Sequence, residues 1–541
     1  IAAPLLASRA MPTLTSRLHH ALLALLLLLA SPWATAWQSD QGDGTYANPV
    51  FWADYPDPDI IRVGEDFYFA TSTFAGSPGM RILHSRDLIN WTIAGYVLPR
   101  LTGSPAFDLQ GRGVNPGVYR RGIYAPSLRH HNGHFYLAVT PVGQHTRLCK
   151  AAQVQGPWDC HELDREAFDP GLFFDTDGKA YVVTSASTDG TITLLSLSED
   201  LKQVTNARKI HYIKGAEGVH VLKRDGVYYL FNAVPWRLGM SISRSRSLDG
   251  PWETIESINT AETGGHQGAI VELADGRWWG FVMQDKPAIG RVTNMSPIFW
   301  KDGWPIWGTP EAPGRVPMRA TKPIQGHPLA QPATSDEFSE PQLGLQWMWN
   351  HNPVDTAWSL RERPGHLRLR ALPAPDFWHA RNTLTQKSQG PWSRVEISMD
   401  LSRLGVGDQC GLGTLGRYNG QLYATREPAG QLSLNWRLIT DQGDKDPQTV
   451  QDGPRVPISS ERVELRLEID YVTTNRARLS WRAPGQSAWQ VVGEPFELKF
   501  DWRTGTFQGP QVAMFCFSTR NNGSQAAGYV DIDWFRFSDK P

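Results

Sequence analysis

Short runs of aromatic and β-branched residues, each opened by a turn dipeptide, recur along the first 325 residues. They read G-E-D-F-Y-F-A-T-S (64–72), N-G-H-F-Y-L-A-V-T (132–140), D-G-K-A-Y-V-V-T-S (177–185), D-G-V-Y-Y-L-F-N-A (225–233) and D-G-R-W-W-G-F-V-M (275–283). Asn-Gly and Asp-Gly favour tight hairpin turns because both central positions need positive φ. The last four runs lie about 45–50 residues apart, which is the length of a four-stranded blade. Five copies therefore predict a five-bladed β-propeller over roughly 45–325.

The pattern changes after residue 335 to a two-residue alternation of apolar and polar positions. Clear examples are V-E-I-S-M-D-L (395–401), V-E-L-R-L-E-I (463–469) and V-D-I-D-W-F-R-F (530–537). Strands of this kind have one buried and one solvated face, as in two packed sheets. Because the preceding stretch is rich in Pro and small polar residues, we expect a linker at 326–335 and a β-sandwich at 336–541. The predicted fold is therefore all-β, a propeller followed by a sandwich.

Residues 1–36 have the pattern of a secretory signal peptide with a few upstream residues. Met11 fits a translation start, the apolar run A-L-L-A-L-L-L-L-L-A (21–30) follows a basic region, and A-T-A (34–36) fits a cleavage site before Trp37. The apolar run is too short to span a bilayer comfortably. We expect an exported protein, periplasmic or extracellular, without stable membrane association; an uncleaved anchor is the alternative.

Charge and cysteine content narrow the picture further. The formal net charge of −1 removes any electrostatic case for binding nucleic acid or an anionic membrane. The 22 Trp suit a surface that stacks on sugar rings, but a large β-protein core also uses Trp. Cys149 and Cys160 flank the turn signal Q-G-P-W, so they face each other across a hairpin either as a disulfide or as two free thiols.

A short polar motif precedes each predicted hairpin by seven to nine residues. The motifs are P-D-P-D with Asp57, Y-A-P-S with Tyr124, D-P-G with Asp169, A-E-G-V-H with Glu217 and G-H-Q-G with His266. The strand before the hairpin is innermost in a propeller, so these side chains should converge at one end of the axis. Glycoside hydrolysis needs one carboxylic acid to protonate the leaving oxygen and a second carboxylate to act on the anomeric carbon. A single Asp is ordinarily a turn cap, but three carboxylates at matching positions favour a catalytic site.

These motifs resemble glycoside hydrolase family 43, a family of inverting five-bladed propellers. Y-P-D-P-D-I-I-R-V-G-E-D-F-Y resembles the strand of the catalytic base, which implies that Asp57 is the base. F-D-P-G-L-F-F-D-T-D-G-K-A-Y implies that Asp169 tunes and orients the acid, and A-E-G-V-H-V-L-K-R-D-G-V-Y-Y-L implies that Glu217 is the acid. The retaining fructan hydrolases are also five-bladed, but their W-M-N-D-P-N-G and R-D-P motifs are absent here.

The resemblance implies roles for other residues of the pocket. G-H-Q-G-A-I-V places His266 on the axis, with calcium and water beneath the site; a histidine hydrogen-bonded without metal is the alternative, and we expect no organic cofactor. I-G-R-V-T implies that Arg291 contacts sugar hydroxyls, and S-T-F implies that Phe74 lines the pocket of the terminal sugar. Tyr124 stands where the family usually has Trp. Asp59 is expected to hydrogen-bond its local turn.

Residues 336–541 resemble the concanavalin-like jelly-roll domain of β-xylosidase-type members, which often shields the mouth of the propeller. G-T-F-Q-G (505–509) offers Phe507 as a lid residue, with a packed hairpin aromatic as the alternative. We therefore expect an exo-acting, inverting hydrolase that releases a terminal pentose from xylan-derived oligosaccharides, with β-D-xylosidase activity favoured. The alternatives are an α-L-arabinofuranosidase acting on arabinoxylan or arabinan and a non-catalytic sugar-binding propeller.

Overall fold

The computed structural model describes residues 37–109, 119, 122–185, 189–258, 265–441, 448–502, 507–520 and 528–539. The predicted signal segment, residues 1–36, lies outside this described part. Within it, regular helical structure is confined to short 3₁₀ turns, and none of the described helices is long and apolar enough to cross a membrane. The predicted all-β class is confirmed.

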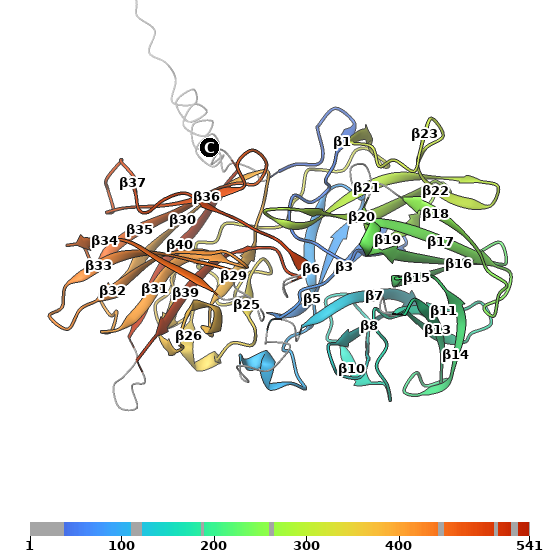
Figure 1. Ribbon diagram of the computed structural model, residues 1–541, viewed down its shortest axis with the longest axis horizontal. Helices are drawn as coiled ribbons and strands as arrows, with labels where there is room; N and C mark the ends of the chain where they lie inside the picture. The colour runs from blue at the N-terminus through green and yellow to red at the C-terminus, as the bar shows by residue number, and fades with distance from the viewer. Residues whose placement is uncertain are drawn as a thin grey trace, which may run out of the picture. The chain divides into compact units, whose positions relative to one another are not determined.

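Five antiparallel sheets form the propeller, one blade following another from the blue to the yellow-green part of the chain (Figure 1). The first three blades are β2 (Asp59–Val63), β3 (Asp66–Thr71), β5 (Gly79–Ser85) and β6 (Trp91–Leu98); β7 (Ile123–His131), β8 (His134–Pro141), β9 (Arg147–Ala151) and β10 (Asp159–Glu162); and β11 (Gly171–Phe174), β12 (Ala180–Ser185), β13 (Thr191–Leu197) and β14 (Val204–Tyr212). The last two are β15 (Glu217–Arg224), β16 (Val227–Val234), β17 (Gly239–Ser245) and β18 (Glu253–Ile258); and β19 (His266–Glu272), β20 (Trp278–Lys286), β21 (Gly290–Lys301), β22 (Trp304–Thr309) and β23 (Ala312–Pro313). The first strands contact one another in a closed ring, β2–β7–β11–β15–β19–β2, which confirms that the strand before each hairpin is innermost.

The hairpin turns follow the dipeptides only in part. At 132–133 and 225–226 both turn residues have positive φ, as expected for Asn-Gly and Asp-Gly. At 177–178 and 275–276 only the Gly has positive φ, so the prediction of the same turn is wrong there. In both cases the Asp carboxylate accepts a hydrogen bond from the N–H two residues ahead, and this local bond favours a longer turn.

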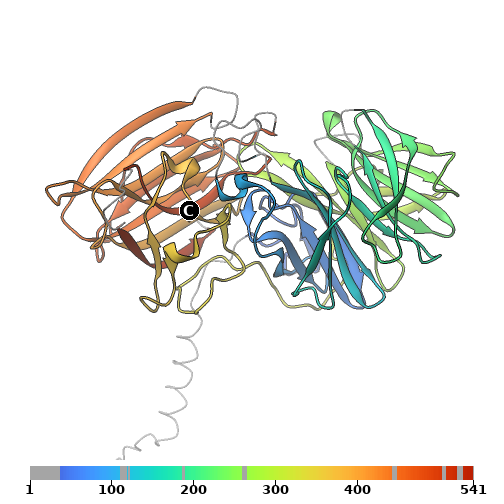
Figure 2. The same ribbon diagram turned by 90° about the horizontal axis from the view of Figure 1, so that it is seen from below.

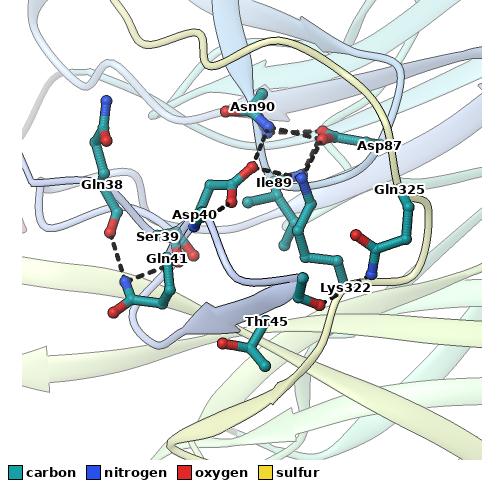
Figure 3. A network of polar contacts seen from close by, with 12 residues as sticks. Gln38, Ser39, Asp40, Gln41, Thr45, Asp87, Ile89, Asn90, Lys322 and Gln325 are labelled. Carbon is teal, nitrogen blue, oxygen red and sulfur yellow. Dashed lines mark hydrogen bonds and ion pairs between the residues drawn. The ribbon is translucent and has the colours of Figure 1, made fainter.

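The ring is closed by strand β1 (Thr45–Ala47), which pairs with β24 (Arg319–Thr321). Figure 3 shows a buried polar cluster beside this closure. The ammonium of Lys322 pairs with Asp40 and lies 3.4 Å from Oδ2 of Asp87, and the Asn90 amide donates to both carboxylates at 2.9 and 2.7 Å. Because a buried charge is stable only with partners, this cluster fastens both ends of the propeller to blade 1.

The C-terminal region is a sandwich of two sheets, as predicted, and all their strands but one short one pair antiparallel (Figure 2). The first sheet contains β34 (Thr449–Ile458), β33 (Leu432–Thr440), β32 (Asn419–Arg426), β31 (Asp408–Leu415), β39 (Gln511–Ser518), β29 (Leu384–Lys387) and β25 (Met348–Asn350), with β28 (Leu372–Pro373) beside β39. The second contains β26 (Trp358–Ser359), β27 (Leu367–Arg370), β40 (Tyr529–Ser538), β30 (Trp392–Asp400), β35 (Arg462–Asp470), β36 (Arg476–Arg482), β37 (Gln490–Val491) and β38 (Phe496–Glu497). The alternating residues of β30 and β35, such as Ile397 and Leu465, are buried in one continuous core between the sheets.

The four cysteines form two disulfides, each across neighbouring antiparallel strands. Cys149 of β9 is bonded to Cys160 of β10, which decides between the two states that the sequence left open. Cys410 of β31 is bonded to Cys516 of β39. The sequence gives no sign of the second bond, because its partners are separated by 106 residues.

The propeller and the sandwich share a sheet. Strand β4 (Gly76–Ser77), between the second and third strands of blade 1, pairs with β25 and so extends the first sheet of the sandwich. The expected linker is hydrogen-bonded to both regions. The Ala330 N–H donates to Asn90 of the propeller at 3.0 Å, and the Thr334 carbonyl accepts from Gln386 of the sandwich at 2.7 Å. The two regions are therefore continuous in structure, although their sequence patterns are distinct.

Candidate active site

Each inner strand has a residue in the left-handed backbone region within two residues of its first position. These residues are Asp57 (φ 54°), Ala125 (41°), Asp169 (45°), Gly218 (59°) and Gln267 (50°). In blades 2, 4 and 5 the pairing register shifts at this point, as in a β-bulge, which re-aims side chains. The acid candidate Glu217 and His266 come one position earlier than Asp57 and Asp169. The three carboxylates therefore come from two successive positions of the repeat. The expectation that they occupy matching positions is wrong by one residue.

Asp57 is buried and held by three groups. Its Oδ2 accepts a hydrogen bond from the Ser72 hydroxyl at 2.5 Å, and its backbone N–H points to the sulfur of Met283 at 3.2 Å. The Arg291 Nη1 lies 3.6 Å from Oδ1. Burial alone would lower the pKa of Arg291, but the carboxylates of Asp57 and Asp285 raise it above its usual value. The site thus contains a permanent cation beside the Asp57 carboxyl group.

Asp169 and Glu217 lie close enough to interact electrostatically, and both line the same cavity. The Asp169 Oδ2 accepts a hydrogen bond from the N–H of Gly218, the residue after Glu217, at 3.1 Å. Burial, and then the negative charges of Glu217 and Asp57, raise the pKa of Asp169 well above its ordinary value. Because ionising both members of a buried carboxyl pair is costly, the pair retains a proton to higher pH than an isolated carboxyl.

His266 lies on the other side of Arg291, with Asp285 between them. The His266 Nε2 is 3.3 Å from Oδ1 of Asp285, and the Arg291 Nε is 3.5 Å from the same oxygen. Burial alone would raise the pKa of Asp285, but the hydrogen bond with His266 and the charge of Arg291 hold it below its usual value. The register of β20 and β21 places Asp285 directly opposite Arg291. Asp285 was not identified from the sequence as a site residue, and this pairing across the predicted hairpin is the signal that could have revealed it.

These residues do not by themselves suit calcium. Among the described residues no group of three or more His, Cys, Asp or Glu side chains is arranged to hold a metal ion. Calcium takes six to eight oxygen ligands, whereas His266 offers one nitrogen and the nearby oxygen of Asp285 already faces the Arg291 cation. No catalytic step is therefore derived through a metal.

Aromatic rings form part of the wall. The ring of Tyr124 meets that of Phe507 edge to face, with centroids 5.6 Å apart, and the Arg291 guanidinium lies 5.6 Å from the Phe507 centroid. Phe74 is fully buried and packs edge to face against Tyr124, with centroids 5.3 Å apart. Of the described residues predicted for the wall, Tyr124 and Phe507 line the cavity, while Phe74 supports Tyr124 without lining it.

The cavity has a volume of about 590 Å³. Its lining comes from all the blades and the sandwich: Asp57, Tyr124, Thr140, Val142, Glu166, Phe168, Asp169, Gly215, Glu217, Pro235, Trp236, Leu238, His266, Gln267, Arg291, Trp502 and Phe507. The last two belong to the C-terminal region. A cavity of this size with aromatic walls and few converging charged groups is typical of a small-molecule site.

Beneath the cavity, Asp54 connects the propeller with the sandwich. Its fully buried carboxylate accepts hydrogen bonds from the N–H groups of Arg291 at 2.8 Å and Gly509 at 3.0 Å. It also pairs with the ammonium of Lys387 from β29 at 3.0 Å. Burial lowers the pKa of Lys387, and the charge of Asp54 opposes that effect. Asp54 thus fixes the backbone next to Arg291 and the loop that carries Phe507.

Asp59 does not bond its local turn, so that prediction is wrong. Its carboxylate accepts a hydrogen bond from the N–H of Leu128 at 2.7 Å and pairs with the Arg129 guanidinium at 2.7 Å, both on β7. The His220 Nδ1 on β15 lies 3.4 Å from its other oxygen. The inner strands converge at the axis, so Asp59 reaches neighbouring blades more readily than its own backbone.

Comparison with known proteins finds matches to both regions of the chain. Residues 46–305 match Glycosyl hydrolases family 43, and residues 335–538 match the Beta xylosidase C-terminal Concanavalin A-like domain. A Beta-xylosidase of Formosa agariphila is 31% identical over 92% of this chain and 91% of its own length. A non-reducing end α-L-arabinofuranosidase of Bacteroides ovatus is 32% identical over 64% of this chain and 68% of its own.

A solved structure extends the likeness to both regions. It is a family 43 glycoside hydrolase with an engineered active site, described as displaying both endo-xylanase and exo-arabinofuranosidase activity. It aligns with a TM-score of 0.81 and 26% identity over 92% of this chain and all of that one. Together, the matched propeller, the matched sandwich and the full-length relative show that the chain belongs to glycosyl hydrolase family 43 and is a glycoside hydrolase.

Proposed function

We propose that this enzyme is an exo-acting, inverting glycosidase that releases a terminal pentose from xylan-derived oligosaccharides, with β-D-xylose as the favoured sugar. The observation that carries the proposal is the convergence of Asp57, Asp169 and Glu217 on one cavity whose wall includes two sandwich aromatics. A wall contributed by a second region favours a closed pocket over an open groove. A closed pocket suits the end of a chain.

In the proposed reaction, Asp57 takes a proton from water as that water attacks the anomeric carbon. The Ser72 hydroxyl and the Arg291 guanidinium hold the two carboxyl oxygens of Asp57 in place. Glu217 gives its proton to the leaving oxygen, and the bond from that oxygen to the anomeric carbon breaks. An inverting pair needs its carboxyl groups roughly 6.5–9.5 Å apart so that the water fits between them.

Asp169 is proposed to act on Glu217 and not on the substrate directly. Burial and the charge of Glu217 raise the pKa of Asp169, so the carboxyl pair retains a proton, and the Asp169 carboxylate accepts a hydrogen bond from the Gly218 N–H, which fixes the backbone beside the acid. Arg291 has its charge available to sugar hydroxyls at the cavity wall, and Asp285 and His266 hold its inner side.

The choice of β-D-xylose rests on the sandwich, because the matched domain is named for β-xylosidases. α-L-Arabinofuranose is the alternative, since a relative of 32% identity is named for it and the two pentoses present similar hydroxyl groups. Rates of xylose release from xylobiose and of arabinose release from arabinoxylan decide between the two sugars.

We also propose that the protein is exported, to the periplasm or beyond. The signal-like residues 1–36 support this, and so do the paired cysteines, because disulfides persist in oxidising compartments. Calcium is proposed only as an ion held mostly by water beside His266. No organic cofactor is needed for the reaction as written.

Two measurements test the proposed function. The NMR spectrum of the first-formed sugar, recorded before mutarotation, should show the configuration opposite to that of the substrate; retained configuration would overturn the assigned mechanism. The Glu217→Gln variant should lose hydrolysis of an aryl β-D-xyloside while keeping its melting temperature. Activity at the wild-type level in this variant would exclude Glu217 as the acid.

A further inference from the structure

Two large aromatic side chains at the cavity stand out because they are exposed. Trp236 is 66% exposed and Phe168 is 44% exposed. Of the large apolar side chains that are exposed in the described part of the chain, only these two line the cavity. Exposed aromatic surface at the edge of a concave site is typical of a ligand contact, since a core position would bury it.

Both rings are carried by segments that adjoin the acid. Glu217 on β15 is the direct cross-strand partner of Ala233 on β16, and Trp236 follows in the 3₁₀ turn Pro235–Arg237. Phe168 immediately precedes Asp169, whose carboxylate bonds the Gly218 N–H.

Arg291 and Phe507 lie elsewhere. The Arg291 guanidinium faces Asp57 and the ring of Phe507. Arg291 and Phe507 therefore lie beside the catalytic base Asp57, whereas Trp236 and Phe168 come from segments that adjoin the acid Glu217 and Asp169.

The backbone that carries Trp236 is held by several contacts, although the ring itself is exposed. Pro235 opens the turn, and the Leu238 N–H closes it by donating to the Pro235 carbonyl at 2.9 Å. Arg237 pairs with Glu256 on β18. The indole lies directly on the backbone of Gly215, where an added Cβ would come within 2.5 Å of its Nε1. A rigid exposed ring loses little conformational entropy on binding, which favours a role in recognition.

We propose that Trp236, with Phe168, is a stacking platform for the leaving-group saccharide, and that the platform selects a flat pyranose ring as the leaving group. This inference rests on the proposed role of Glu217: the acid must reach the glycosidic oxygen, so the leaving sugar lies on the side of the acid. Aromatic rings offer a large apolar face at low entropic cost, and the C–H face of a pyranose is the complementary surface. The released terminal pentose lies on the side of Asp57 and Arg291.

The test compares substrates that do and do not cover the platform. In Trp236→Ala, kcat/KM for xylobiose should fall roughly 10-fold, mainly through KM, as for an aromatic contact residue. Methyl β-D-xylopyranoside has too small a leaving group to stack, so its kcat/KM and the inhibition constant of D-xylose should be unchanged. Trp236→Phe should restore most of the loss. Tyr212→Ala is the matched control, because Tyr212 is 61% exposed and does not line the cavity.

Equal losses for xylobiose and the methyl xyloside would overturn the platform, and so would an unchanged xylobiose rate. Calorimetry in the Glu217→Gln background separates this result from failure of the proposed function. There, adding Trp236→Ala should weaken the binding of xylobiose and leave that of D-xylose unchanged. If Glu217→Gln remains active, the assigned acid is wrong. The stacking platform is then still tested by the change that Trp236→Ala causes in kcat/KM for xylobiose and for methyl β-D-xylopyranoside. If the enzyme prefers arabinofuranosides, the same test uses arabinosyl xylobiose in place of xylobiose and methyl α-L-arabinofuranoside in place of methyl β-D-xylopyranoside.

Discussion

Breaking the buried pair of Asp54 and Lys387 should destabilise the protein strongly, and replacing Lys387 by Met tests this. Both side chains are almost fully buried, at 0% and 2% exposure. Lys387→Met keeps the length of the apolar stem and removes the charge. Asp54 would then remain buried as a carboxylate whose two other donors are the N–H groups of Arg291 and Gly509.

Removing one partner of a buried ion pair costs 3–5 kcal/mol or so, because the other charge is left uncompensated. Two N–H groups still face Asp54, so we expect the lower end, about 3 kcal/mol. That loss shifts the unfolding equilibrium by roughly a hundredfold. The double variant Asp54→Asn with Lys387→Met removes both charges and should lose less than Lys387→Met alone.

The assay is urea unfolding followed by tryptophan fluorescence, run beside kinetics on an aryl β-D-xyloside. Lys179→Met is the matched control, because Lys179 and Asp177 lie 2.9 Å apart, almost the distance of the buried pair, but are 69% and 46% exposed. Its unfolding midpoint should not change, since exposed pairs are screened by solvent. KM should rise in Lys387→Met, because Asp54 positions the backbone at Arg291 and Gly509.

Two results would refute this reasoning. If the urea midpoint of Lys387→Met equals that of Lys179→Met, burial of the ion pair does not increase the loss of stability on breaking it. A double variant less stable than Lys387→Met would mean that Asp54 is not harmed by losing its partner.

Four further outcomes follow from the site. Asp169→Asn should lower kcat and move the basic limb of the pH–rate profile to lower pH, because the carboxyl pair loses a negative charge that holds its proton; an unchanged profile would contradict that role. Ser72→Ala removes the hydrogen bond to Asp57 and an acceptor for the Ala125 N–H, so kcat should fall about 10- to 100-fold with little change in KM; equal activity would exclude Ser72 from positioning the base. A chelator should leave activity and melting temperature unchanged, whereas a loss reversed only by calcium would establish a required ion near His266. Xylose release from xylobiose should exceed arabinose release from arabinoxylan, and the reverse ratio would reassign the sugar.

The repeats made the propeller predictable, since turn dipeptides and aromatic strands are local signals. They also brought Asp57, Asp169 and Glu217 to one site, because any residue at the start of an inner strand lies near the axis. The one-residue offset between Asp57 and Glu217 was not predictable: it depends on left-handed backbone at Asp57, Asp169 and Gly218, which only the register of the strands reveals.

Contacts between residues far apart in the sequence were also not predictable. Asp54 and Lys387 are separated by most of the chain, and neither belongs to a repeat motif, so nothing local indicates their contact. Asp59 was assigned to its turn because a Pro-flanked Asp usually bonds nearby backbone, yet it reaches β7 at the axis. Sequence reasoning therefore located the reacting groups and missed the groups that hold them in place.

The loop that carries Phe507 has a consequence for the timing of biosynthesis. In an exported protein, the propeller can close its ring through β1 and β24 as soon as residue 321 has crossed the membrane, because an N-terminal unit generally folds first. Its catalytic carboxylates are then in place, but Lys387, Phe507 and Gly509 have not yet crossed. The propeller should at that stage be folded and inactive, and hydrolysis should begin only when the C-terminal region has followed. A cell that makes this enzyme would thereby avoid releasing catalytically competent fragments from interrupted synthesis.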